Sequence, residues 1–303
     1  MSVVLRRLYP GLRISQDAVH AVVLCRRKKL HHLRAARGLS FDTGVVVPSR
    51  RELNIKRPDA FVEALTNVLC PITGHEDRIA LSLPDASGHI VLTQLDSPSK
   101  SREEGRDILR WQLRKNLPGE WKDIHLDFQV LRREDSGRQQ VLTAIIDRAV
   151  LNQYEELVIR AGFHAVQVGF HSLDLYAYYR SRLEMGGDFV FIGIEGATLT
   201  IEIFQDGVPV FYRVRSFIED ADQVFQELNR SLSGMRSAQR GKVFLHSDWT
   251  GKDALSQVLA SLFDTDPVVL DPQFSRMVDP EYQQQFAADA KLASAIGAAE
   301  RMM

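Results

Sequence analysis

The chain has 303 residues, of which 45% are hydrophobic and 25% charged, and its formal net charge is −1. This composition is ordinary for a folded protein with room for two domains. The near-neutral charge gives no electrostatic case for nucleic-acid binding, and two separated cysteines, Cys25 and Cys70, predict neither a disulfide framework nor a zinc site.

The sequence also predicts a cytoplasmic protein. No window contains the roughly 18 to 20 uninterrupted apolar residues of a membrane-spanning helix, and the opening MSVVLRRLYPGL has its charges after the apolar stretch, unlike a signal peptide. Residues 1–60 hold 13 Lys and Arg against 4 Asp and Glu. A solvated face explains this excess, and an anionic membrane surface or an acidic partner is the alternative.

The first part of the chain predicts three antiparallel strands followed by a helix. Residues 12–24 alternate around a polar turn at 15–17, which is typical of a strand pair, and residues 29–41 add a third strand. The three-and-four spacing of apolar residues in 57–70 predicts a helix with one buried face. A further strand, at 77–84, ends at a proline.

The next segment predicts an α+β unit of its own. Its strands are expected at 89–96, 124–134 and 139–147, and its helices at 101–117 and 148–162. Ile108, Trp111, Leu126, Phe128 and Val130 are its expected core. A strand at 164–170 and a helix at 173–183 then return to the first lobe, before a hinge at 185–188.

From residue 189 the early pattern recurs. Three strands are expected at 189–194, 198–205 and 208–214, then a helix at 219–235, a strand at 242–247 and a helix at 252–263. The tail is predicted to form a closing helix of this second lobe. Three strands and a helix therefore occur twice, which indicates an internal duplication with an insertion in its first copy.

This organisation resembles the actin-like ATPase superfamily. Within it, ALSLP (80–84), LDFQVL (126–131) and VLTAIIDRAVLNQYEELVIRAGF (141–163) are similar to the inserted subdomain of PilM-like proteins of type IV pilus assembly. The resemblance implies an α/β, two-lobed actin-like ATPase fold with an inserted α+β subdomain. The first lobe would span 1–84, completed by 164–184, the inserted subdomain 85–163, and the second lobe 188–303.

The resemblance also locates the first of two hairpins that, in active members, cradle phosphates with glycine amides beside a metal-binding aspartate. Here Arg13 stands at the aspartate position, Ser15 at the glycine position, followed by Gln16, and His20 at a usual lysine position. A guanidinium group has only donors and cannot ligate Mg²⁺.

The second hairpin and the adenosine-facing turn depart from the pattern as well. The second hairpin has Gly193 for the usual aspartate and Glu195 for the usual glycine, while Gly196 and Thr198 keep the small and hydroxyl character. A carboxylate at that position repels phosphate. The turn against the adenosine has Ser247 and Asp248 in place of two glycines. The resemblance thus implies a degenerate nucleotide cleft in a pseudo-ATPase, with no cofactor expected and weak binding of ATP with Mg²⁺ left open.

The function implied by the resemblance is that of a cytoplasmic scaffold in type IV pilus assembly or related type II secretion, peripheral to the inner membrane. Its partner would be a PilN-like bitopic inner-membrane protein, which attaches it to the membrane and inserts a short cytoplasmic N-terminal peptide into a groove beside the inserted subdomain. Other pilus or secretion components are further possible partners. No sequence motif identifies the groove residues.

Two other functions stay open. One is an active ATPase in which Asp17, Glu195 or Asp248 holds the metal, and the other is a cell-division actin homologue, although the expected basic amphipathic C-terminal helix is missing from the sequence. The histidines at 20, 31 and 32 lack the spacing of a metal-ligand set, because neighbours on a strand point to opposite faces. We therefore interpret them as structural.

Overall fold

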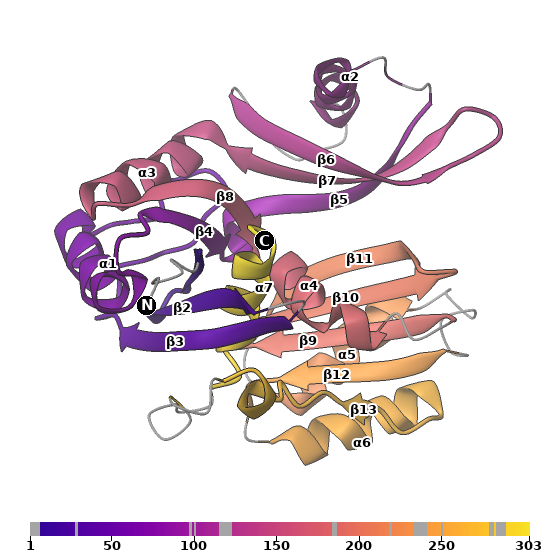
Figure 1. Cartoon of the computed structure of the whole chain (residues 1–303). Coiled ribbons are helices and arrows are strands. Elements are labelled where there is room, and N and C mark those ends of the chain that lie inside the picture. Colours follow the sequence, from indigo (N-terminus) through magenta and orange to yellow (C-terminus); the bar gives the residue numbers. More distant parts are fainter. Residues whose placement is uncertain are drawn as a thin grey trace.

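The computed structural model describes residues 7–27, 30–96, 99, 101–114, 123–183, 187–217, 220–232, 241–249, 251–278, 282 and 289–303. Two five-stranded sheets lie next to each other, and a three-stranded sheet covered by a helix projects above them (Figure 1). None of the helices in these ranges combines the length and the apolar character that a bilayer crossing requires.

The first sheet has the strand order β3-β2-β1-β4-β8. Its strands are β1 (Leu8–Ile14), β2 (Ala18–Arg27), β3 (Leu30–Ser40), β4 (Arg78–Leu83) and β8 (His164–Phe170). The first three pair antiparallel, whereas β4 pairs parallel with both β1 and β8. Helix α1 (Pro58–Thr73) begins at a proline, which suits the first turn, and buries Phe61, Leu65 and Leu69 in the core beside this sheet.

The second sheet repeats this arrangement with the order β11-β10-β9-β12-β13. Its strands are β9 (Phe189–Glu195), β10 (Thr198–Gln205), β11 (Val208–Ser216), β12 (Lys242–Ser247) and β13 (Val268–Val269). Helices α5 (Ala221–Leu232) and α6 (Lys252–Phe263) share its apolar core. An antiparallel meander followed by two parallel strands occurs in both sheets, so the predicted duplication is confirmed.

The inserted segment begins after β4 with the short helix η1 (Asp85–Ser87). It continues through β5 (Gly88–Leu95), α2 (Arg102–Arg114), β6 (Ile124–Arg133), β7 (Gln139–Asp147) and α3 (Arg148–Arg160). The three strands form a sheet in the order β5-β7-β6, and α2 covers one face of it (Figure 1). The end of the helix predicted for 101–117 lies outside the described residues.

The predicted core of this segment is wrong at one position. Trp111 is 62% exposed, and the α2 side chains buried in the core beneath the helix are Leu109 and Leu113. Residues four apart share a helix face, whereas a residue two positions on points away from it. Ile108 and Val130 are partly buried against the core, and Leu126 and Phe128 belong to it.

Replacing Phe128 by alanine is expected to lower the free energy of unfolding by about 3 kcal/mol, because it leaves a cavity under α2. The ring is 8% exposed, and a methyl group added at Gly105 of α2 would lie 2.6 Å from it. Urea denaturation followed by circular dichroism measures the change. Trp111→Ala is the control, with an expected change of at most about 0.5 kcal/mol; equal losses in the two variants would contradict this packing.

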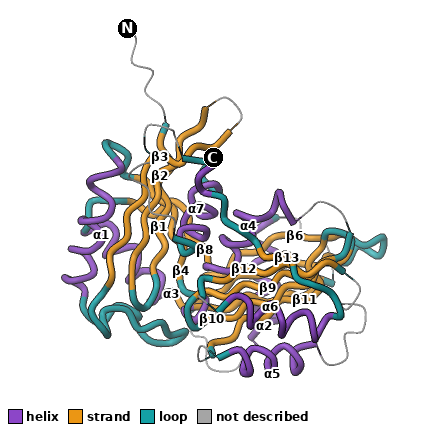
Figure 2. The backbone as a smooth tube through the Cα atoms, turned by 90° about the horizontal axis from the view of Figure 1, so that it is seen from below, coloured by secondary structure: helices purple, strands orange, loops and turns teal. Residues whose placement is uncertain are grey.

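Helices α4 (His171–Leu183) and α7 (Leu292–Glu300) pack against each other between the two five-stranded sheets (Figure 2). The contact is close: a methyl group added at Gly297 would lie 1.8 Å from the carbonyl oxygen of Asp174. The tail was expected to close the second lobe, yet α7 contacts β1, β2 and β4 of the first sheet as well as α4. A short helix, η3 (Phe274–Arg276), precedes it. The division into lobes at 1–84 with 164–184, 85–163 and 188–303 stays a prediction.

Candidate functional site

A buried ion pair joins the two duplicated hairpins. Arg13, near the end of β1, and Glu195, the last residue of β9, have side chains that are 4% and 6% exposed, and Arg13 Nε lies 3.6 Å from Glu195 Oε2. On its other side, Glu195 Oε1 lies 3.6 Å from His246 Nε2 of β12. The Ser294 hydroxyl of α7 donates to Oε2 across 3.5 Å. Two side chains that depart separately from the nucleotide-binding pattern therefore meet as opposite charges.

The charges around this pair keep Glu195 ionised. Burial alone would raise the pKa of Glu195, but Arg13 and His246 hold this pKa at about 2. Burial and then Arg13 lower the pKa of the neighbouring His171 to about 3. Among the described residues, Nε and Nη1 of Arg13 find no hydrogen-bond acceptor, so Glu195 serves mainly as its counter-charge. If the predicted nucleotide cleft held a phosphate and its metal here, they would have to displace this pair.

The turn of the second hairpin is held by Asp248. Gly196 has φ +54, a conformation that glycine adopts without strain, and its N–H donates to both Asp248 carboxylate oxygens at 2.9 Å. Its carbonyl accepts a hydrogen bond from the indole of Trp249 at 3.1 Å. Burial raises the pKa of Asp248. The Gly196 amide is thus occupied by a side chain of the same protein.

The first hairpin turn is closed by its own side chains and covered by the chain before α7. The Ser15 hydroxyl donates to Asp17 at 2.7 Å, and the Asp17 carboxylate also lies 3.5 Å from Lys291 Nζ. His20 Nε2 lies 3.4 Å from Asp289 Oδ2, and a hydrogen bond from His20 is the main reason that the pKa of Asp289 falls to about 2. Residues 289–291 therefore lie against this turn.

The predicted site residues thus divide into three groups. Arg13, Glu195, Gly196 and Asp248 come together between the sheets, whereas Ser15, Gln16 and His20 lie at or beside the first turn, with Gln16 exposed. The remaining three, Gly193, Thr198 and Ser247, belong to the β9, β10 and β12 strands. Each carboxylate proposed for the metal of an active ATPase has a partner within the chain. That the cleft is degenerate stays a prediction.

Sequence reasoning missed a buried polar chain beside this pair. Asp85 follows β4, and Ser172 is the second residue of α4, which follows β8. The Ser172 N–H donates to Asp85 at 3.2 Å, and its hydroxyl bonds both Asp85 and the Tyr212 hydroxyl of β11. Burial raises the pKa of Asp85 to about 6, against the effect of these hydrogen bonds. The sequence did contain a signal for this chain, namely the position of Asp85 and Ser172 just after two strands. Polar residues that follow adjacent parallel strands gather at one edge of the sheet.

A groove of about 670 Å³ lies between the inserted sheet and β8, and we call it the β8 groove. Its apolar lining includes Leu142, Ala144, Ile146, Leu151, Val166 and Val168. Val166 is 48% exposed there. In the described sheet, β8 is an edge strand, so one side of its backbone faces this groove rather than another strand. Figure 1 shows β8 below the inserted sheet.

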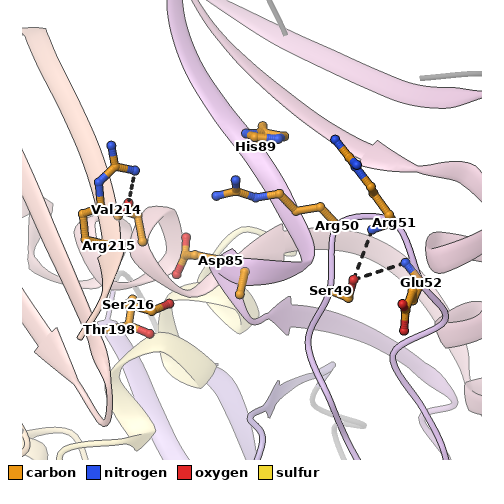
Figure 3. Close-up of a pocket in the computed structure, with 11 residues that line it drawn as sticks. Ser49, Arg50, Arg51, Glu52, Asp85, His89, Thr198, Val214, Arg215 and Ser216 are labelled. Atoms are coloured by element: carbon orange, nitrogen blue, oxygen red, sulfur yellow. Dashed lines mark hydrogen bonds between the residues drawn. The ribbon is translucent and has the colours of Figure 1, made fainter. Parts of the chain in front are cut away.

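A second cavity, of about 560 Å³, opens where the β3–α1 loop, the start of β5 and the β10–β11 hairpin meet (Figure 3). We call it the three-arginine cavity, after Arg50, Arg51 and Arg215, which line it together with His89. It shares no lining residue with the β8 groove.

Comparison of the structure with solved proteins identifies several similar folds. The PilM–PilN type IV pilus biogenesis complex contains a chain with a TM-score of 0.80 and 17% identity, covering 97% of this chain and 98% of that one. A Bacteroides thetaiotaomicron protein with an actin-like ATPase fold has a TM-score of 0.55 and 11% identity, with 92% and 95% covered. The cytoplasmic domain of EpsL, an inner-membrane component of the type II secretion system of Vibrio cholerae, has a TM-score of 0.52 and 12% sequence identity. That match covers 97% of this chain and 95% of the EpsL domain.

These likenesses confirm the predicted α/β actin-like ATPase fold and, at the level of the fold, the resemblance to PilM. A scan against protein-family models finds no match, and a search of the curated proteins finds none.

Proposed function

We propose that this protein is a cytoplasmic scaffold of a type IV pilus or a related type II secretion machine, peripheral to the inner membrane. It binds an extended peptide from a PilN-like bitopic inner-membrane protein in the β8 groove and does not hydrolyse ATP. The observation that carries the proposal is a groove along an edge strand, with apolar side chains from β7 and β8 and charged ones such as Arg102, Asp127 and Arg301 in its lining. It occurs in a fold similar to that of a protein solved in a complex with PilN.

The β8 groove has the two features that extended peptides use. An edge strand offers backbone N–H and C=O groups for a ladder of hydrogen bonds, and pockets on one side accept alternate side chains. β8 is seven residues long, and apolar side chains from β7 and β8 line the groove. Polar groups at Gln129, Glu155 and Gln167 add positions for hydrogen bonds. Affinity would therefore come from the backbone and a few apolar anchors.

The contacts in the cleft support the absence of ATPase activity. The Arg13–Glu195 pair, the Asp248 carboxylate on Gly196 and the residues against the first turn each use a group that a nucleotide or its metal would need. A scaffold needs the two-lobed shape but does not need ATP hydrolysis. The occupied cleft therefore supports a function that depends on a surface outside the nucleotide cleft.

ATP with Mg²⁺ is expected to show no binding of micromolar strength or tighter in calorimetric titration, and no hydrolysis. Glu195→Gly alone is not expected to restore binding. That change removes one carboxylate, but it leaves the buried guanidinium of Arg13 uncompensated and Asp248 on the turn amide. Hydrolysis of ATP by either protein, or a micromolar site for ATP with Mg²⁺ that persists when Arg50 and Arg215 of the three-arginine cavity are replaced by alanine, would contradict the pseudo-ATPase proposal.

The scaffold proposal is tested with a synthetic peptide that carries the cytoplasmic N-terminus of the PilN-like protein encoded beside this one. Titration is expected to give micromolar affinity or better, equal with and without ATP, with weak dependence on salt because apolar anchors dominate. A scrambled peptide of the same composition is the control. The proposal is wrong if no binding occurs up to millimolar peptide, or if binding requires ATP.

A further inference from the structure

The three-arginine cavity is built on a loop that the protein holds rigidly. Asn54 is fully buried, and its side-chain amide donates to the carbonyls of Ser49 and Glu52, both at 2.7 Å. Its carbonyl oxygen accepts from the Ser87 hydroxyl at 2.6 Å and from the Tyr154 hydroxyl at 3.1 Å. This buried side chain therefore fixes the loop that carries Arg50 and Arg51 against η1 and α3. Loops held in this way bind ligands at a lower entropic cost.

The cations of the cavity come from three separate parts of the chain. Arg50 projects from the loop, and its Nε donates to the carbonyl of Gly88 at the start of β5 at 3.0 Å. Arg215 comes from β11 on the opposite side, and Arg50 lies between it and Arg51 in Figure 3. Burial lowers the pKa of Arg50, and the nearby charge of Arg215 lowers this pKa further. Two like charges thus face each other across the opening.

Acidic groups near the cavity only partly compensate these charges. Among the described residues, Arg50 has no carboxylate within 4 Å. Arg215 lies 3.5 Å from Glu227, but that carboxylate is shared with Arg213 at 2.9 Å and Arg230 at 3.2 Å.

The two acids that line the cavity each have another partner. Glu52 lies 3.2 Å from Lys56, and Asp85 is hydrogen-bonded by Ser172. His89 adds no charge near neutral pH, because burial, Arg50 and Arg51 lower its pKa to about 4. The cavity therefore keeps a net positive charge.

We propose that the three-arginine cavity binds a small soluble molecule that carries phosphate groups, and that this ligand bridges the β3–α1 loop and the β10–β11 hairpin. Guanidinium groups match phosphate oxygens with paired hydrogen bonds, and the hydroxyls of Thr198 and Ser216 line the same cavity as further donors. A volume of about 560 Å³ is suited to a small molecule. The cavity borders the Arg13–Glu195 cleft, with which it shares Asp85 and Thr198, but neither Arg13 nor Glu195 lines it. It shares no residue with the β8 groove, so the proposal goes beyond the scaffold function.

Pyrophosphate is the probe, and it is titrated calorimetrically into the whole chain at constant ionic strength. Sodium chloride at the same ionic strength is the control for screening. We expect saturable binding to one site. We also expect the double variant Arg50→Ala/Arg215→Ala to bind about tenfold or more weakly, since each lost contact is a charge-assisted hydrogen bond. Arg215→Ala alone is the second variant, because this exposed side chain can be removed without loss of the Arg50 bond to Gly88.

The matched control is Arg110→Ala/Arg160→Ala, which removes the same charge from exposed pairs elsewhere. We expect it to bind pyrophosphate as the unmodified protein does. Equal weakening in both double variants would overturn the proposal, as would the absence of saturable binding. Tighter binding of hexaglutamate than of pyrophosphate would overturn it in favour of an acidic peptide. Binding only to phosphatidylglycerol vesicles would overturn it in favour of a membrane surface.

Discussion

Replacing Glu195 by glutamine is expected to lower the free energy of unfolding by about 3 to 5 kcal/mol. The substitution keeps the size of the side chain but removes the negative charge beside Arg13, and a buried charge without a partner is strongly destabilising. Both side chains are at least nine-tenths buried, so water cannot replace the missing carboxylate. Urea denaturation of the two proteins at neutral pH measures the difference.

The double variant Arg13→Met/Glu195→Leu separates the pair from its individual charges. Replacing both partners by apolar residues of similar size removes the cost of desolvation together with the attraction, so we expect stability within about 1 kcal/mol of the unmodified protein. Asp107→Asn, which breaks an exposed pair with Arg110, is the surface control and is expected to cost less than about 1 kcal/mol. A similarly small loss in Glu195→Gln would contradict the buried ion pair.

The same pair predicts a pH dependence. The pKa of Glu195 in the folded protein is about 2, below its ordinary value of 4.5, because Arg13 and His246 outweigh the effect of burial. A depressed folded-state pKa gives stability that is present above about pH 4.5 and is lost as the pH falls towards 2. The difference in stability between the unmodified protein and Glu195→Gln should therefore shrink over that range.

The duplicated architecture could be predicted because strands and helices leave periodic signals. Alternation around a polar turn located both hairpins, and the same order of elements in two parts of the chain indicated two equivalent sheets. Trp111 was misplaced because it was placed by its helical spacing from Ile108, which is only partly buried, whereas the buried face of α2 runs through Leu109 and Leu113. Contacts between segments far apart in the sequence leave no such signal.

The candidate site shows the same limit. From the sequence, Arg13 and Glu195 are two separate departures from a nucleotide-binding pattern, and only their proximity in space shows that each neutralises the other. Asp248 is likewise a lost glycine in the sequence but a hydrogen-bond acceptor for Gly196 in the fold. The three-arginine cavity depends on a loop, an insertion and a hairpin that meet only after folding. The sequence therefore indicated which residues had changed, but it could not indicate what the changed residues do.

Introducing charge into the β8 groove is expected to weaken binding of the PilN-like peptide by about 100-fold. Leu142→Asp and Val166→Asp together place two carboxylates on opposite walls, one on β7 and one on β8. Apolar anchors in the centre of an interface commonly contribute 1 to 2 kcal/mol each, and a loss of roughly 2.7 kcal/mol corresponds to about two decades in the dissociation constant. Calorimetric titration with the same synthetic peptide measures the change.

A stability control is needed because charge can also disturb folding. Ile159→Asp changes an exposed apolar residue of α3, 54% accessible and outside the groove lining, in the same chemical way. We expect this variant to bind the peptide with unchanged affinity. We also expect the free energy of unfolding of the groove variant to lie within about 1 kcal/mol of that of the unmodified protein, because neither side chain that it changes is fully buried.

Unchanged affinity in a folded groove variant would place the peptide elsewhere. Equal losses of affinity in the groove variant and in Ile159→Asp would show that charge acts through the overall electrostatic field. Only a loss confined to Leu142 and Val166 assigns the peptide to the β8 groove.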